Sequence, residues 1–422
     1  MSDLTITPID DRTSWNYALR QFETAHILQT WEWGEFKRAT TGWEPLRWAF
    51  RRDGQIVALI SLGVRRVGPF ALMYAPKGFV CAPDDLATAE QVLAHLERFS
   101  RRQPTVWLKI DPDIVLATGL PNSPDDLPHP TGQRWQALLM RRGWRFSADQ
   151  VQFRNTLCID LTRDEDALLA AMSQNTRRKV RAAEKHGVTI RTGTLADLPL
   201  LYSLYQITGE RDGFLIRPYD YYQRAWRNFM EDGLAHALIA ELHGHPIAHV
   251  ILLHFGRKCW YFYGASSNDH REAMPNYALQ WAAIRWAKAQ GYAVYDMWGA
   301  PDDFVETDPL WGVYEFKRGF RGTITRHLGA WDYAPFPPLY WGYTRAVPAL
   351  RRMSKWLPSP PVPSPTRRCA AGARGAALIP KSPLLWRGDS PLLLREKGLG
   401  MRPCHLRHSH AAPSDAALMM VR

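Results

Sequence analysis

Alternating apolar and polar positions predict a β-hairpin early in the chain. Its strands are expected at Glu44–Phe50 and Ile56–Val67, joined through Asp53-Gly54, a dipeptide that favours tight hairpin turns. Further elements are expected on either side of the hairpin, namely helices at about Ser14–Phe22, Trp31–Lys37 and Leu86–Arg102, and strands at Ala71–Ala75 and Thr105–Asp111.

The same order of elements returns about 185 residues later in the chain. The second hairpin, strand, helix and strand are expected at Ala235–Leu242 with Ile247–Phe255, Trp260–Ala265, Asn276–Gln290 and Ala293–Trp298. Such repetition predicts an α/β protein with mixed sheets, in two duplicated lobes that face each other across a central cleft. A single large mixed sheet is the alternative. We place the first lobe at residues 1–155 and the second at 156–357.

A long amphipathic helix is expected between the lobes, from about Asp164 to His186. Arg177, Arg181 and Lys185 stand four residues apart in its basic second half, so they line one face of the helix. A solvated helix surface explains this pattern. A face that binds the phosphates of RNA, or of a pyrophosphate-linked substrate, explains it as well.

The net charge of +12 is unevenly distributed along the chain. Residues 358–422 hold ten Lys/Arg and three Asp/Glu, so they account for +7, and their proline-rich start predicts a disordered low-complexity tail. No apolar run approaches the roughly 20 residues that span a bilayer, and the N-terminus lacks a signal-peptide pattern. The five cysteines are scattered without a C-x-x-C pair. A reduced, cytoplasmic setting is therefore expected.

Two other segments bear on partners and cofactors. The histidines at 243, 245, 249 and 254 have no carboxylate at ligand spacing, so neither a metal nor another cofactor is expected. The segment Trp331–Leu357 is aromatic, broken by proline and then basic. We expect it either to pack back onto the second lobe or to lie on the inner, anionic membrane face as an amphipathic helix.

The segment Tyr314–Phe320 carries the main candidate for catalysis. Lys317 stands among aromatic residues in an expected strand, with Gly319 close behind it. A cation held among apolar groups suits a site where negative charge develops during a reaction. The same pattern also fits an ordinary strand lysine with its ammonium in water. Arg217, before the Tyr221-Tyr222 pair, can fork onto a phosphate or be an exposed turn arginine.

Four short runs of the sequence follow one another in a recognisable order. They are Gln29–Lys37, Tyr74–Gly78, Leu108–Pro112 and Tyr314–Phe320, and the resemblance that they carry covers about residues 20–345. Together they resemble the FemABX family of peptidoglycan bridge-forming aminoacyltransferases, in its shorter form without a coiled-coil arm. This chain departs from the family pattern at Arg321-Gly322, where a Gly-Gly pair is usual, and in its tail.

The resemblance implies a fold, an activity and roles for particular residues. The implied fold has two GNAT-like acyltransferase lobes. The implied reaction moves an amino acid from aminoacyl-tRNA to an amine of a UDP-linked or lipid-linked precursor peptide. Lys317 would be tied to catalysis, and Asp111 matches the aspartate at the end of the first lobe's central strand. Lys37 and Arg217 would contact the phosphates of the precursor. Substrate contacts are thus expected from Lys37, Arg217, Tyr221, Phe316 and Tyr263.

The implied chemistry agrees with the residue types. An amine would attack an ester carbonyl, and a fixed cation such as Lys317 would stabilise the tetrahedral oxyanion. Asp111 could orient or deprotonate the amine. No Ser-His-Asp or Cys-His arrangement is legible, so direct transfer without an acyl-enzyme is expected. The alternatives are an acetyl-CoA-dependent N-acetyltransferase, whose Gln/Arg-x-x-Gly-x-Gly/Ala loop is not visible, and a non-catalytic protein that binds RNA or membrane surfaces.

Overall fold

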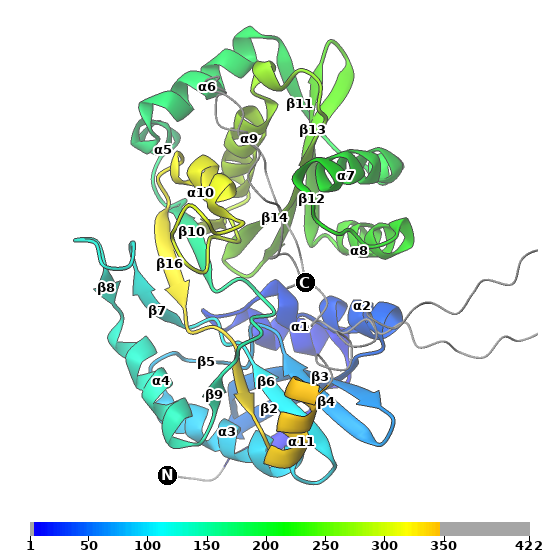
Figure 1. Ribbon diagram of the computed structural model, residues 1–422, viewed down its shortest axis with the longest axis vertical. Coiled ribbons are helices and arrows are strands. Elements are labelled where there is room, and N and C mark those ends of the chain that lie inside the picture. Colours follow the sequence, from blue (N-terminus) through cyan, green and yellow to red (C-terminus); the bar gives the residue numbers. More distant parts are fainter. Residues whose placement is uncertain (1–3, 347–422) are drawn as a thin grey trace, which may run out of the picture.

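The computed structural model describes residues 4–346, so the tail predicted at 358–422 lies outside the described residues. Two mixed β-sheets form the framework, one above the other in Figure 1, and helices pack against both. The predicted α/β fold with two lobes is therefore confirmed.

The first sheet comes mainly from the N-terminal part of the chain. Its strand order is β1-β2-β3-β4-β6-β17-β9, and β5 pairs with β3. Its strands are β1 (Thr5–Pro8), β2 (Glu44–Arg52), β3 (Gln55–Val67), β4 (Phe70–Ala75), β5 (Val80–Cys81), β6 (Thr105–Ile110), β9 (Arg145–Phe146) and β17 (Trp331–Tyr333). The helices of this part are α1 (Arg12–Arg20), η1 (Ile27–Gln29), α2 (Trp31–Thr41), α3 (Leu86–Ser100) and α4 (Pro130–Arg141).

The second sheet has the order β11-β12-β13-β14-β15-β10-β16-β7-β8. Its strands are β7 (Val115–Thr118), β8 (Leu127–Pro128), β10 (Asn155–Asp160), β11 (Val188–Thr192), β12 (Ala235–Leu242), β13 (His245–Phe255), β14 (Lys258–Ser266), β15 (Val294–Asp296) and β16 (Thr323–His327). The helices here are α5 (Glu165–Ala171), α6 (Gln174–Lys185), η2 (Leu195–Asp197), α7 (Leu198–Asp212), α8 (Tyr219–Glu231), η3 (Arg271–Ala273), α9 (Pro275–Ala289) and α10 (Trp311–Arg318). Helix α9 covers one face of the sheet, and α7 and α8 cover the other (Figure 1).

The internal repeat is present in the structure. In the first lobe, the β2–β3 hairpin is followed by antiparallel β4, helix α3 and then β6, which is parallel to β4. In the second lobe, β12–β13 is followed by antiparallel β14, helix α9 and then β15, which is parallel to β14. The expected elements at both places are thus confirmed, and the turn residue Asp53 takes a positive φ of 50°.

The two sheets exchange short strands at their edges. Strands β7 and β8 precede residue 155 but extend the second sheet, because β7 pairs with β16 and β8 pairs with β7. Strand β17 comes from the C-terminal part of the chain and pairs with β6 and β9 in the first sheet. The division between the sheets therefore does not coincide with the boundary predicted between residues 155 and 156.

The segment after Trp331 packs differently from the prediction. We expected it on the second lobe or on a membrane, but β17 joins the first sheet. Tyr340, in helix α11 (Pro337–Trp341), packs against Leu72, Val106 and Trp107 of that same sheet. The short π-helix η4 (Gly342–Ala346) ends the described residues, and Arg351 to Leu357 lie beyond them. Packing onto the second lobe is thus wrong for the described part of this segment.

The predicted helix from Asp164 to His186 is two helices. Its first part ends at Ala171, because the Ser173 hydroxyl accepts a hydrogen bond from the Thr176 backbone N–H and caps α6. The Ser173 backbone N–H donates to the Gly319 carbonyl instead of continuing a helix. A serine that caps a new helix competes with helix continuation.

Helix α2 joins the lobes through aromatic packing. Trp33 on α2 contacts Phe229 of α8 and Phe262 of β14, with ring centroids 6.1 and 6.3 Å apart. One hydrophobic cluster therefore runs from the N-terminal helices into the second sheet. Among residues 4–346, no helix combines the length and the apolarity that crossing a bilayer requires.

Candidate active site

Three of the predicted substrate-binding residues meet between the lobes. Lys37 on α2 donates a hydrogen bond from Nζ to the Tyr221 hydroxyl on α8 at 2.9 Å. The Arg217 guanidinium lies 4.7 Å from the centroid of the Tyr221 ring. We call Lys37, Arg217 and Tyr221 the phosphate cluster, since two cations and a hydroxyl at one place suit a phosphorylated ligand.

Aromatic rings give the phosphate cluster a rigid support. The Phe36 and Tyr221 rings are 5.0 Å apart, and Lys37 Nζ lies 4.8 Å from the centroid of the Trp33 ring. The predicted contact residue Tyr263 is buried, and its ring touches Tyr222, the residue after Tyr221. Tyr263 therefore supports the cluster from within the core.

Lys317 lies on a helix, so the strand predicted for Tyr314–Phe320 is wrong. Val, Tyr and Phe favour strands by propensity, but Val313, Tyr314, Phe316 and Lys317 fall on one helical face and are all buried in α10. The predicted contact residue Phe316 packs on Tyr277 and Phe320, away from the phosphate cluster.

The Lys317 ammonium is completely buried, with an exposed fraction of 0%. Its Nζ donates to the backbone carbonyls of Trp298 and Gly299 at 2.6 and 2.7 Å. Among residues 4–346, no carboxylate lies within ion-pairing distance of this nitrogen. Burial lowers the pKa of Lys317 to about 7, against a smaller opposing effect of Asp296. The interpretation of Lys317 as a strand lysine in water is therefore wrong.

Aromatic rings connect Lys317 to the phosphate cluster. Trp33, which touches Lys37, also contacts Phe262, and Phe262 stacks on Trp298 with centroids 5.2 Å apart. The Trp298 carbonyl is one of the two acceptors for Lys317. The two groups of residues thus lie at opposite ends of one continuous packed region.

Asp111 lies in a separate buried group at the junction of the sheets. It is 1% exposed, and its Oδ1 lies 3.8 Å from Lys77 Nζ. Tyr74 donates a hydrogen bond to its Oδ2 at 3.3 Å. Burial raises the pKa of Asp111 to about 6, partly offset by Lys77. Lys77 Nζ also lies 5.8 Å from the centroid of the Trp298 ring, so Trp298 stands between Asp111 and Lys317.

Sequence reasoning did not find the charged residues next to Asp111. Asp113 pairs with Lys258 at 2.6 Å and with His327 at 3.4 Å, and so joins the end of the first sheet to β14 and β16. Burial would raise the pKa of Asp113, but Lys258 and then His327 hold it well below its usual value. The Lys77 position was signalled by the Tyr74–Gly78 run, whereas Lys258 and His327 had no signal in the sequence.

Helix α6 carries the predicted phosphate face. Arg181 and Lys185 are exposed, as that prediction requires. Arg177, however, donates to the carbonyls of Ala170 and Met172 at 2.6 Å, so it also satisfies the end of α5. Gly319, just after α10, approaches α6 so closely that a Cβ there would lie 2.2 Å from the Thr176 hydroxyl. The basic helix therefore begins directly beside the helix of Lys317.

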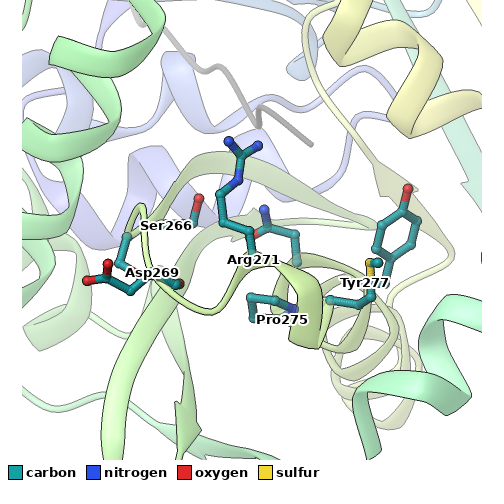
Figure 2. A pocket seen from close by; sticks show the side chains of 8 residues that line it. Ser266, Asp269, Arg271, Pro275 and Tyr277 are labelled. Carbon is teal, nitrogen blue, oxygen red and sulfur yellow. Dashed lines mark hydrogen bonds between the residues drawn. The ribbon is translucent and has the colours of Figure 1, made fainter. Parts of the chain in front are cut away.

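A small pocket lies where β14 ends and α9 begins (Figure 2). The buried Ser266 hydroxyl on its wall has no hydrogen-bond partner among the described residues. Tyr277 on another wall accepts a hydrogen bond from Lys179 of α6 and touches Phe316 of α10. The pocket thus adjoins both the basic helix and the helix of Lys317. Its lining residues are Ser266, Ser267, Asp269, Arg271, Met274, Pro275, Asn276 and Tyr277.

Within residues 4–346, no group of three or more His, Cys, Asp or Glu side chains is arranged to hold a metal ion. Two of the histidines considered above have other contacts. His249 is buried with its Nε2 2.9 Å from the Leu201 carbonyl, and His254 contacts the Tyr292 hydroxyl.

Comparison with solved structures identifies the class of fold. The crystal structure of FemX superposes with a TM-score of 0.70 at 24% identity, and covers 80% of this chain and 98% of that one. A conserved protein of unknown function from Bacteroides thetaiotaomicron gives a TM-score of 0.50 at 12% identity, covering 78% and 98%. The two-lobed fold is therefore that of FemX.

The family follows from the sequence comparisons. The model of the FemAB family matches residues 16–245 and 243–347, so the chain belongs to the FemAB family. The lipid II:glycine glycyltransferase of Staphylococcus haemolyticus (strain JCSC1435) is 25% identical over 392 residues, covering 77% of this chain and 92% of that protein. The enzyme of the same name from Staphylococcus aureus (strain COL) is 26% identical over 397 residues, covering 77% and 92%. The predicted family is confirmed, and so is the prediction of a transferase.

Proposed function

We propose that this protein transfers an amino acid from aminoacyl-tRNA to an amine of a peptidoglycan precursor peptide. The observation that carries the proposal is the buried Lys317 ammonium, which is held by two neutral carbonyls and has no carboxylate partner among the described residues. The relatives named as glycyltransferases acting on lipid II support a lipid-linked precursor as the acceptor.

The acceptor is proposed to bind at the phosphate cluster. Lys37 and Arg217 supply two positive charges from different lobes, and Tyr221 supplies a hydroxyl between them. A pyrophosphate link to a nucleoside or to a lipid would meet both cations. This arrangement favours a phosphorylated precursor over a free peptide.

Lys317 is proposed to act on the ester of the donor. The acceptor amine attacks the ester carbonyl carbon, a C–N bond forms, and negative charge develops on the carbonyl oxygen. The tetrahedral intermediate then breaks its C–O bond to the ribose, whose oxygen leaves with a proton. A protonated Lys317 that donates to two carbonyls keeps a third N–H, which can donate to the oxyanion.

Asp111 is proposed to orient or deprotonate the acceptor amine. Its Oδ1 accepts no hydrogen bond within residues 4–346. Burial raises its pKa to about 6, which makes it a stronger base than an exposed aspartate. Lys77 and Tyr74 hold the carboxylate in place.

The donor is proposed to approach along α6. Arg181 and Lys185 are exposed for contact with RNA phosphates, and Lys179 leads to the pocket beside α10. The loop that opens α9 contains no glycine between Ser266 and Met274, unlike a pyrophosphate-binding loop for acetyl-CoA. With these substrates, the reaction is proposed to take place in the cytoplasm, with peripheral contact at the inner membrane face where the acceptor is lipid-linked.

Donor competition tests the proposal. The protein is incubated with a radiolabelled precursor pentapeptide, either UDP-linked or lipid-linked, together with a charged tRNA pool, acetyl-CoA, or both. We expect product only where charged tRNA is present, and no slowing by acetyl-CoA. Acetylated product, or transfer that does not depend on whether the tRNA is charged, would refute the proposal.

A further inference from the structure

The two carbonyls that hold Lys317 belong to a turn in an unusual backbone conformation. Trp298 has a φ of +54° and Gly299 a φ of +30°, so a tryptophan occupies the left-handed region. Hydrogen bonds to β10 anchor both sides of the turn. The Met297 N–H donates to the Leu157 carbonyl, and the Ala300 N–H donates to the Asn155 carbonyl, each at 2.8 Å.

The conformation of this turn determines where the Lys317 ammonium lies. With both ends tied to β10, the Trp298 and Gly299 carbonyls turn toward the same nitrogen. A bulky residue in the left-handed region is strained and persists only where its surroundings impose it. Some group must therefore hold Trp298 in this state.

Asp296, the last residue of β15, makes that contact. Its Oδ1 accepts a hydrogen bond from the Trp298 backbone N–H at 2.7 Å, and another from the Thr156 hydroxyl. A carboxylate that bonds the backbone N–H two residues ahead closes a local turn. Asp296 is 3% exposed, so water does not replace these bonds.

The same carboxylate is the charged group that acts on Lys317. It raises the pKa of Lys317 while burial lowers it. Burial raises the pKa of Asp296 itself, against hydrogen bonds from Thr156 and the positive charge of Lys258. The other groups around the pair are Asp113, the Cys158 thiol and the ring of Tyr261, which lies 5.6 Å from Lys317 Nζ.

We infer that Asp296 is a positioning residue for transfer, which holds the Trp298–Gly299 turn so that both carbonyls meet Lys317, and supplies the negative charge that favours the protonated ammonium. The inference rests on the proposed function. In the proposed function, Lys317 stabilises the oxyanion. The inference adds that the position and the protonation of Lys317 depend on Asp296.

Two substitutions separate the two parts of this role. Asp296→Asn keeps an oxygen that can accept from the Trp298 N–H but removes the charge. Asp296→Ala removes both. If protonated Lys317 is the active form, the rate falls as pH rises through its pKa. Loss of the charge then moves this alkaline limb to lower pH, by about one pH unit. Asp296→Ala should also lower kcat by roughly 10–100-fold, with the KM for precursor unchanged.

The experiment measures kcat and KM against pH for wild type, Asp296→Asn, Asp296→Ala and the control Asp303→Asn, which changes an exposed aspartate of the following loop. The same substitutions are made in Lys317→Arg, where the guanidinium stays protonated, so the shift of the limb should disappear. The pKa of Lys317 is also measured without an activity assay, by following its Cε signal against pH by NMR in the lysine-labelled protein. Thr156→Val removes the hydrogen bond from the Thr156 hydroxyl to the Asp296 carboxylate and should lower kcat severalfold. This variant replaces Asp296→Asn in the test if Asp296→Asn does not fold.

The outcomes are distinguishable. A shifted limb and a lower NMR pKa in Asp296→Asn, absent with Lys317→Arg, support the inference. An unshifted limb in folded Asp296→Asn, or unchanged kcat in folded Thr156→Val where that variant replaces it, overturns the inference while wild-type transfer still stands. No transfer by wild type overturns the proposed function itself, and the NMR titration then decides whether Asp296 sets the Lys317 pKa.

Discussion

Lys317→Met removes the buried ammonium and keeps an unbranched apolar stem in its place. The side chain is fully buried on α10, so methionine fills the same space between Tyr261 and the Trp298–Gly299 turn. If Lys317 donates to an oxyanion that exists only in the transition state, kcat and kcat/KM fall together while KM changes little. Loss of one such donor lowers kcat by about 10²–10³, or ~2.7–4 kcal/mol.

The effect on stability should be much smaller than the effect on rate, because two terms oppose each other. Methionine leaves the carbonyls of Trp298 and Gly299 without their donor, at about 1–3 kcal/mol each. It also removes the cost of burying a cation. A pKa of about 7 instead of 10.5 corresponds to a cost on the order of 5 kcal/mol below neutral pH. We therefore expect a folded protein with a similar Tm.

The assay is single-turnover transfer from charged tRNA to precursor by wild type, Lys317→Met and Lys317→Arg, with circular dichroism to confirm folding. Arg318→Met is the matched control, because Arg318 is the exposed neighbour on the same helix. Arginine at 317 should rescue only part of the rate, since its planar group has a different shape and reach. Folded Lys317→Met that transfers at the wild-type rate would refute the catalytic role.

Four further predictions concern precursor binding, pH dependence, tRNA binding and the C-terminal segment. Arg217→Ala should raise the KM for precursor by about 10–100-fold, the loss of one charge-assisted contact, and leave the response to aminoacyl-tRNA unchanged. Arg224→Ala, which changes an exposed arginine of the following helix α8, is the control, and equal loss for both substrates would indicate disturbed packing of the lobes. The wild-type kcat should fall as pH rises through about 7, where Lys317 loses its proton, and Lys317→Arg should abolish this fall; a wild-type rate that stays level above pH 7 contradicts it. Arg181→Ala should weaken tRNA binding and reduce its salt dependence, as measured by filter binding at several salt concentrations, and an unchanged salt slope argues against contact with phosphates. Deletion of residues 358–422 should leave Tm and transfer nearly unchanged, and loss of folding would show that the sequence was misinterpreted there.

The repeated lobes could be predicted because their signals are local and strong. The β2–β3 and β12–β13 hairpins alternate in hydrophobicity, and turn residues such as Asp53-Gly54 mark where the chain reverses. The exchange of strands could not be predicted. Strands β7, β8 and β17 span only two to four residues, which is too short for a period, and their pairing depends on distant parts of the chain.

The sequence predicted several residues of the candidate site but not how they are arranged in space. Lys37, Arg217 and Tyr221 meet as the family resemblance implied. Lys317 was placed on a strand because Tyr, Phe and Val favour strands, whereas burial of one helical face decided the outcome. Asp296 and Trp298 lay within a predicted strand, but a positive φ at a tryptophan has no signature in the sequence.

The mass of the precursor after incubation shows whether the protein transfers aminoacyl residues and whether Lys317 is needed for the transfer. Wild type and Lys317→Met are each incubated with precursor pentapeptide and a charged tRNA pool, and the mass of the precursor is then measured by mass spectrometry. With wild type and charged tRNA, we expect the precursor to gain the mass of one or more aminoacyl residues. With deacylated tRNA it should gain nothing, and with folded Lys317→Met it should gain far less in the same time. An unchanged precursor with wild type, or equal product from both proteins, would contradict these expectations.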